Sequence, residues 1–207
     1  MCTICGTPFL TRGDTDHACS RCLRQPPRFG RARACAVYDA RDMRTTDGDA
    51  VRAADPLRSA LQRYKYNRDV SLAPLLGAWL AQYAPLSAAA YDVIVPVPLH
   101  ISRLRWRGFN QAQLLLRPFA GNCAIDPYSL ARVRPTRPQV GLPEKERRGN
   151  VAGAFRVTRP RHVEGQRILL VDDVYTTGAT VDECSRALRR AGAHSVDVLV
   201  LARAMRH

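Results

Sequence analysis

The sequence predicts an α/β protein: a mostly parallel sheet with helices on both faces, preceded by a small four-cysteine module. From Tyr91 onward, apolar runs that suit strands alternate with helical patterns, an order typical of a parallel sheet in three layers. The clearest run is residues 168–171, ILLV, whose unbroken apolar character suits a strand buried on both faces. We expect the module to span residues 1–28 and the α/β domain residues 29–207, with two consecutive prolines just before the boundary.

Weaker patterns complete the set of elements. Short runs of strand-forming residues lie at 34–38, 49–53, 91–95, 130–133, 154–157 and 195–201. Helical spacing of apolar residues occurs at 56–64, where a proline suits the first turn, at 72–83, and from 181 to about 192.

The composition favours an anionic partner. The chain has 207 residues and a net charge of +14, with 32 Lys and Arg against 18 Asp and Glu. Only Lys65 and Lys145 are lysines, and the planar arginine side chain suits phosphate groups. Genome composition is an alternative source of the arginine bias. The charge therefore suits a polyphosphate ligand, nucleic acid or both, and does not choose between them.

The sequence also predicts a cytoplasmic protein with no membrane insertion. No apolar run is long enough to span a bilayer, and the N-terminus lacks the basic and apolar segments of a secretion signal. A reducing compartment favours metal-binding cysteines over disulfides.

Four of the seven cysteines form two CxxC pairs, thirteen residues apart: Cys2, Cys5, Cys19 and Cys22. Each pair can present two thiolates to one ion, and four thiolates complete the tetrahedral sphere of a structural Zn2+. The segment has too few apolar residues to fold alone, so metal binding would supply its stability. The gap is slightly short, so His17 is an alternative ligand, and a disulfide or redox pair is a further alternative. The other three are expected to be structural: Cys35, Cys123 and Cys184.

Candidate ligand-binding residues follow the apolar run at 168–171 directly. Asp172 and Asp173 fall at the carboxyl end of that strand, where open parallel sheets place ligands. Small and hydroxylated residues come next and lead into a helix: Thr176, Thr177, Gly178, Ala179 and Thr180. Amides at a helix start and threonine hydroxyls can hold a phosphate. Carboxylates beside a phosphate suit a ligand that also carries hydroxyls or a developing positive charge.

A second strand pattern, at residues 91–95, runs into Pro96, Val97 and Pro98. Two prolines cannot continue a central ladder, so a rigid loop is expected at the same edge of the sheet. Three arginines alternate after this loop: Arg103, Arg105 and Arg107. Their spacing suggests an extended basic segment whose side chains point one way, and a solvated surface is the alternative.

Two other polar stretches are candidates for phosphate contact. Residues 134–153 form a long loop with four candidate contact residues: Arg137, Gln139, Arg147 and Arg148. Beside a phosphate site this loop suggests a lid, and a surface insertion is the alternative. Residues 63–68 combine basic and aromatic side chains, including Tyr64 and Tyr66, and suit either a solvated helix end or phosphate contact.

Residues 168–180 closely resemble the 5-phosphoribosyl-1-pyrophosphate (PRPP) signature of type I phosphoribosyltransferases: four apolar residues, two acids and a Thr-Thr-Gly-x-Thr loop. Nearly the whole chain resembles the ComF/GntX family, which is similar to those enzymes and is associated with DNA uptake in natural transformation. The resemblance is carried in order by the four-cysteine module and by residues 63–67, 96–99 (PVPL), 107–111 (RGFNQ), 147–151 (RRGNV), 154–155 and 172–180.

The resemblance implies a role for each stretch. Asp172 and Asp173 would be the catalytic pair on the ribose hydroxyls, and the loop from Thr176 to Thr180 would hold the 5-phosphate. The loop at Pro96, Val97 and Pro98 would contact pyrophosphate, and residues 134–153 would be the flexible loop that closes over the site. Mg2+ would arrive with PRPP. The reaction would displace pyrophosphate at the anomeric carbon of ribose.

The sequence departs from relatives that use nucleobases, because no added hood element follows the last strand and only the N-terminal region is left to cover an acceptor. The first hypothesis is therefore a PRPP-dependent transferase of unknown acceptor. The second is a non-catalytic factor that binds single-stranded DNA, works with DNA-uptake proteins and uses the fold as a binding or regulatory module. The third is a structural adaptor.

Overall fold

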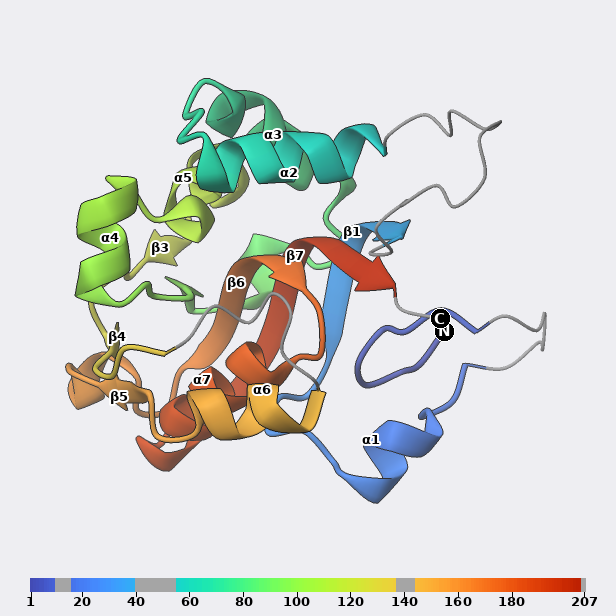
Figure 1. Ribbon diagram of the computed structural model, residues 1–207. Helices are drawn as coiled ribbons and strands as arrows, with labels where there is room; N and C mark the ends of the chain where they lie inside the picture. Colours follow the sequence, from blue (N-terminus) through green and yellow to red (C-terminus); the bar gives the residue numbers. More distant parts are fainter. Residues whose placement is uncertain (10–15, 40–54, 137–143, 206–207) are drawn as a thin grey trace.

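A five-stranded parallel sheet runs through the middle of the molecule (Figure 1). The computed structural model describes residues 1–9, 16–39, 55–136 and 144–205. In spatial order the strands are β1 (Ala32–Asp39), β7 (Ser195–Met205), β6 (Arg167–Tyr175), β2 (Val93–Pro96) and β3 (Ala124–Ile125). All neighbours are parallel, so their carboxyl ends lie at one edge. The predicted α/β fold is confirmed.

The central strand β6 is buried on both faces, as its apolar run predicts. Leu170 is in register with Val95 on β2 and Val198 on β7. Because successive side chains of a strand alternate, Leu169 enters the core on one face and Leu170 enters the core on the other. Both side chains are completely buried.

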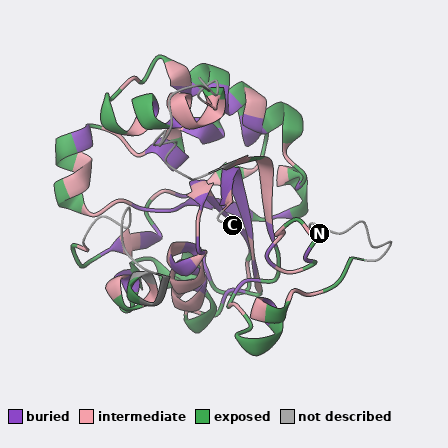
Figure 2. Ribbon diagram, turned by 45° about the vertical axis from the view of Figure 1, so that its right-hand side comes forward, coloured by how far each residue is buried: buried purple, intermediate pink, exposed green. Residues whose placement is uncertain are grey.

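Helices cover both faces and make the three layers (Figures 1 and 2). One face packs against α2 (Pro56–Tyr66), α3 (Leu72–Tyr83) and α5 (Gln111–Phe119). The other packs against α7 (Ala179–Arg190), α6 (Glu144–Val151) and an antiparallel pair, β4 (Leu130–Arg132) with β5 (Phe155–Val157). The N-terminal segment, with the short α1 (Ser20–Arg24), shares this second core through Cys2, Cys5 and Phe29.

Two short elements differ from the sequence predictions. The alternating arginines lie on a helix, α4 (Ile101–Arg107), rather than on an extended segment. The His100 ring accepts a hydrogen bond from the Ser102 amide at the helix start, and Gly108 ends the helix with φ of 86°. The two-residue β3 was not predicted, because so short a strand leaves no periodic signal. The strand expected at 49–53 lies outside the described residues.

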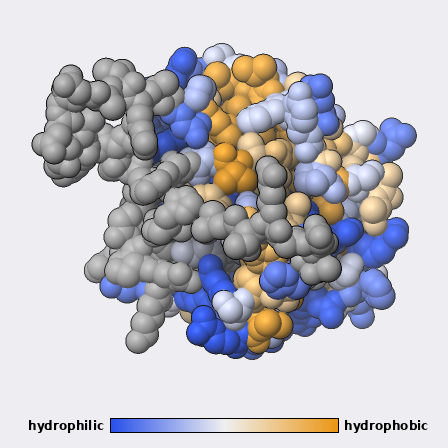
Figure 3. All heavy atoms as spheres, turned by 90° about the vertical axis from the view of Figure 1, so that its right-hand side faces the viewer, coloured by the Kyte–Doolittle hydropathy of each residue, from blue (hydrophilic) through white to orange (hydrophobic). Residues whose placement is uncertain are grey.

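The remaining predicted strands and helices are present, and 3-10 turns occur at Ala88–Ala90 and Pro160–His162. Figure 3 shows that apolar side chains gather in the upper part of one face, at the level of α2 and α3, while hydrophilic ones dominate below. Within the described residues, no helix combines the length and apolar character needed to cross a bilayer.

We predict that Leu169→Ala and Leu170→Ala each lower the free energy of unfolding by about 2–5 kcal/mol, because each empties a buried site on a different face of the sheet. Denaturant unfolding gives the values. Leu75→Ala is the matched control, since Leu75 is 68% exposed on α3, and it should change stability by less than about 0.5 kcal/mol. A small effect at only one of the two β6 positions would contradict burial on both faces.

Candidate functional site

A cavity of about 540 Å³ opens at the carboxyl edge of the sheet. Its size suits a small-molecule site. Its walls come from the end of β6, the loop after β2, and helices α2, α4 and α5. Six of the residues predicted for the site line it: Val97, Pro98, Asp172, Asp173, Thr176 and Thr180.

The two carboxylates at the end of β6 face opposite sides of the sheet, because their side chains alternate. Asp173 is 7% exposed and accepts from Lys65 of α2, whose Nζ lies 2.9 Å from its Oδ1. Asp172 lies toward the other face, and the positive charges of Lys65 and, less strongly, Arg132 of β4 lower its pKa. The Oδ1 atom of Asp172 also accepts from the Asp173 amide at 2.9 Å.

Burial and charge set the protonation of this pair. Burial and, after it, the charge of Asp173 together raise the pKa of Asp172 to about 7, although Lys65 opposes both effects. Burial disfavours the Lys65 ammonium, but attraction to Asp173 outweighs burial and raises the pKa of Lys65. Lys65 is therefore charged near neutrality, where Asp172 titrates.

The loop after β6 has two sides. Thr176 and Thr180 border the large cavity, whereas Thr177 and Gly178 border a second, much smaller cavity beneath the N-terminal segment. Ala179 begins α7 and is buried. Gly178 caps α7 with φ of 78°, and an added Cβ would collide with the Tyr175 hydroxyl. Glycine is therefore required at this turn.

The loop after β2 is held at the same edge. Pro96 is the last residue of β2 and is itself buried in the sheet, so the loop reaches the cavity through Val97, Pro98 and the following Leu99. The Val97 amide donates to the Val171 carbonyl at 2.8 Å, and its carbonyl accepts from Asn110 Nδ2 at 3.0 Å. The loop is thereby tied to both β6 and α5.

Part of the predicted flexible loop is a helix packed on α7. Arg137 and Gln139 lie outside the described residues. Arg147 belongs to α6, and Arg148 donates to Gln25 Oε1 at 2.6 Å and borders the small cavity rather than the large one. Residues 144–148 are strong helix formers, which explains a helix where the polar composition suggested a loop.

Four buried or half-buried side chains of the cavity were not assigned to the site from the sequence: Lys65, Arg107, Gln111 and Arg132. Arg107 and Arg132 are each 9% exposed, and burial lowers the pKa of both. The family resemblance could have pointed to Lys65, Arg107 and Gln111, because residues 63–67 and 107–111 are among the stretches that carry it. The sequence of these stretches alone does not show that they lie beside the end of β6.

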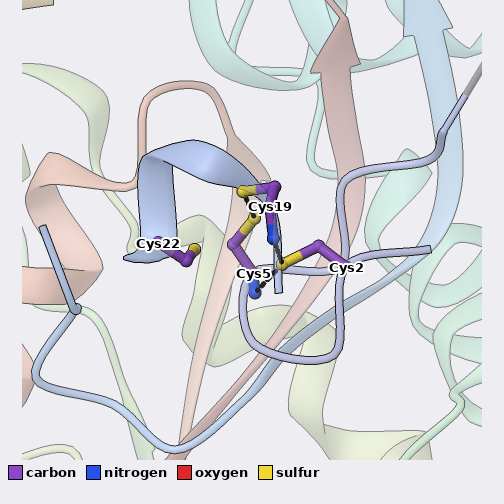
Figure 4. Close-up of side chains that lie close together, drawn as sticks. All are labelled: Cys2, Cys5, Cys19 and Cys22. Carbon is purple, nitrogen blue, oxygen red and sulfur yellow. Dashed lines mark hydrogen bonds between the residues drawn. The ribbon is translucent and has the colours of Figure 1, made fainter. Parts of the chain in front are cut away.

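The four paired cysteines converge from two segments (Figure 4). Their sulfur atoms all lie within 4.8 Å of one another, and those of Cys5 and Cys19 are 3.8 Å apart. Four thiolates around a tetrahedral zinc at about 2.3 Å would lie about 3.8 Å apart, so the group fits such an ion. Burial raises the pKa of Cys2, but donation by the amides of Cys19 and Cys5 outweighs it and lowers that pKa to about 6. His17 is outside this group, and its ring stacks on Phe9.

The N-terminal segment contacts the loop after β6 and the start of α7. Arg21 of α1 donates to the Thr177 carbonyl at 2.6 Å, and the Arg28 amide donates to Asp182 of α7 at 2.6 Å. Arg203 of β7 lies 4.0 Å over the Tyr175 ring and donates to the Cys5 carbonyl.

Comparisons with known proteins identify related sequences. The family described as "Phosphoribosyl transferase domain" matches residues 107–207. The DNA utilization protein YhgH of Salmonella typhi is 35% identical, covering 99% of this chain and 85% of the relative. Competence protein F of Haemophilus influenzae is 32% identical, covering 90% and 78%, and competence protein ComFC of Bacillus subtilis is 29% identical, covering 91% and 79%.

The match to the Salmonella typhi protein covers 99% of the chain and therefore includes the four-cysteine segment. With the parallel sheet and the phosphoribosyl transferase match at the chain's carboxyl half, these relatives fix the family. The chain belongs to the ComF/GntX family.

Proposed function

We propose that this protein binds PRPP in the large cavity and transfers its phosphoribosyl group to an acceptor with release of pyrophosphate. The observation that carries the proposal is the meeting of Asp172, Asp173, Thr176 and Thr180 with the loop at Val97 in one cavity. Relatives named competence proteins support an association with DNA uptake.

The chain's own groups suit the parts of this ligand. Asp172 and Asp173 accept hydrogen bonds from the ribose hydroxyls and stabilise positive charge that develops at the anomeric carbon. The Thr176 and Thr180 hydroxyls, with amides at the start of α7, hold the 5-phosphate. The loop at Val97 and Pro98 orients the pyrophosphate, which leaves with the electron pair of the broken C–O bond.

Magnesium suits this ligand, because carboxylate and phosphate oxygens are the donors it prefers, and when bound it neutralises charge on the leaving group. Lys65 and Arg132 add positive charge to the walls of the same cavity. Such preorganised cations act most strongly in a site that excludes water.

We also propose that Cys2, Cys5, Cys19 and Cys22 hold one structural Zn2+ in a module of residues 1–28. Four sulfur ligands leave no open position for a substrate, so the ion stabilises the module. Through Arg21, the folded module supports the loop that holds the 5-phosphate.

A second candidate function is binding of single-stranded nucleic acid through arginines outside the cavity. It is favoured by the exposed basic groups that flank the cavity on α4 and after α2, such as Arg105 and Arg68, and by the surplus of 32 Lys and Arg over 18 acids. Of the two tyrosines considered for base stacking, Tyr64 is fully buried and donates to the Gln111 carbonyl, so only Tyr66 is accessible.

We predict that the double change Asp172→Asn and Asp173→Asn weakens Mg2+-dependent PRPP binding by on the order of 1.5–3 kcal/mol for each hydrogen bond lost. Calorimetry measures the affinity, and thermal unfolding shows that the variant is folded. Asp92→Asn is the matched control, since Asp92 pairs with Arg167 at the opposite end of the sheet and should leave binding unchanged. Equal affinity in the folded double variant and the parent would show that the acids are not ribose contacts.

We predict one zinc ion per chain in protein purified without chelator, measured by elemental analysis. Replacing Cys19 and Cys22 by serine removes the metal, because two thiolates cannot hold it in place of four. Replacing Cys35 and Cys123 by serine removes the same number of thiols away from the module and should retain it. Full occupancy after loss of Cys19 and Cys22 would rule out this site.

We predict that a labelled single-stranded oligonucleotide binds with little sequence preference and more weakly as salt rises, because phosphates release counterions. Fluorescence anisotropy gives the salt slope. Arg105→Gln should reduce its magnitude by about 0.7, the value for one phosphate contact on a single strand. Arg190→Gln removes the same charge at the far end of α7, near the amino ends of the strands, and should change the slope less. Lack of binding even at low salt would reject this candidate function.

A further inference from the structure

One end of the large cavity is not used by the phosphoribosyl chemistry. Its walls are formed by Tyr66 at the end of α2, Trp106 and Arg107 at the end of α4, and Gln111 at the start of α5. The carboxylates of β6 border the same cavity. Lys65, the neighbour of Tyr66, reaches Asp173 at 2.9 Å, so this aromatic end lies beside the position expected for ribose.

The two aromatic side chains at this end are accessible. Tyr66 is 51% exposed and Trp106 is 50% exposed. The Arg107 guanidinium lies 5.9 Å from the centre of each ring, and Arg68 lies 5.0 Å over Trp106. Rings and guanidinium planes at these distances form a stacking surface for flat molecules.

Two buried donors at the same end have no partner within the described residues. Arg107 Nε and Gln111 Nε2 make no hydrogen bond there, although Arg107 is 9% exposed and Gln111 is 2% exposed. Buried polar groups are normally satisfied, and both side chains line the cavity, so these donors suit acceptor atoms of a ligand. The surrounding backbone is fixed, since Tyr64 Oη donates to the Gln111 carbonyl at 3.1 Å.

We propose that this end seats a planar heteroaromatic ring that carries hydrogen-bond acceptor atoms, either as the free acceptor or as the ring of the product. The ring stacks on Tyr66 and Trp106 and accepts from Arg107 and Gln111. This inference rests on the proposed function. In the transfer, the lone pair of a ring nitrogen forms the bond to the anomeric carbon, the C–O bond to pyrophosphate breaks with its electrons on oxygen, and the nitrogen's proton passes to water.

The test compares ligands with and without the ring. Ribose 5-phosphate and the four common nucleoside 5′-monophosphates are titrated by calorimetry into the full chain. At least one nucleotide should bind roughly tenfold more tightly than ribose 5-phosphate, a factor within the range of stacking on an aromatic side chain. In a Trp79→Phe background Trp106 is the chain's single tryptophan, and the same nucleotide should quench its emission.

The matched variants are Tyr66→Leu and Tyr83→Leu. Both tyrosines are about half exposed, at 51% and 54%, so neither change should unfold the protein, but Tyr83 lies on α3 outside the cavity. Tyr66→Leu should remove most of the preference for the nucleotide and leave ribose 5-phosphate affinity unchanged, whereas Tyr83→Leu should change neither.

The outcomes separate this inference from the proposed function. If ribose 5-phosphate and PRPP bind but no nucleotide binds more tightly, or the two tyrosine variants behave alike, the ring site is overturned and the PRPP site stands. If neither phosphate ligand binds, the proposed function fails, and adenosine then decides the ring site. Quenching of Trp106 by adenosine supports a ring site, and its absence overturns it. An unlabelled oligonucleotide that displaces the nucleotide identifies a base of a strand as the natural ring.

Discussion

Two adjacent carboxylates at the end of the central strand need positive charge nearby, and much of the molecule is arranged around that requirement. Because strand side chains alternate, Asp173 pairs with Lys65 from α2 on one face, while Asp172 lies toward the face that carries β4. The charge of Lys65 acts on Asp172 as well, and Arg132 of β4 adds a weaker contribution. Lys65 and Arg132 belong to α2 and to the β4–β5 hairpin, which both border the cavity at the carboxyl edge. The separation of β6 from α2 and β4 along the chain means that only the complete fold can assemble them.

The sequence predicts features that lie within one continuous segment, but not contacts between segments that are far apart in the chain. The run at 168–171, the acids and the glycine turn are one continuous stretch, so their structure and position in the sheet were predictable. The positions of Lys65 and Arg107 beside that stretch depend on packing between segments far apart in the chain. Helix α4 shows a second limit of sequence prediction. The alternating arginines suggested an extended segment, but the segment is a helix capped by His100 and Gly108.

The N-terminal segment contacts the loop after β6 on the side that faces away from the large cavity. Arg21 donates to the Thr177 carbonyl, and Tyr175, which excludes any side chain at Gly178, is itself covered by Phe29 and Arg203. A glycine turn is intrinsically adaptable, since glycine loses more conformational freedom on folding than other residues. Contacts on the far side restrict that freedom. The N-terminal segment therefore supports the geometry of the loop from the side opposite the large cavity.

The charge balance of the cavity argues that its carboxylates have a specific role. Five cationic side chains line it against two acids: Arg58, Lys65, Arg103, Arg107 and Arg132. A surplus of positive charge is sufficient to attract a polyphosphate, and for attraction alone the acids would be a disadvantage. Asp172 is also costly to keep ionised, since burial raises its pKa to about 7 and weakens the folded state as the pH rises toward that value. These costs support the proposal that the acids contact a ligand directly, since hydroxyls beside a phosphate are ligand groups that require acceptors.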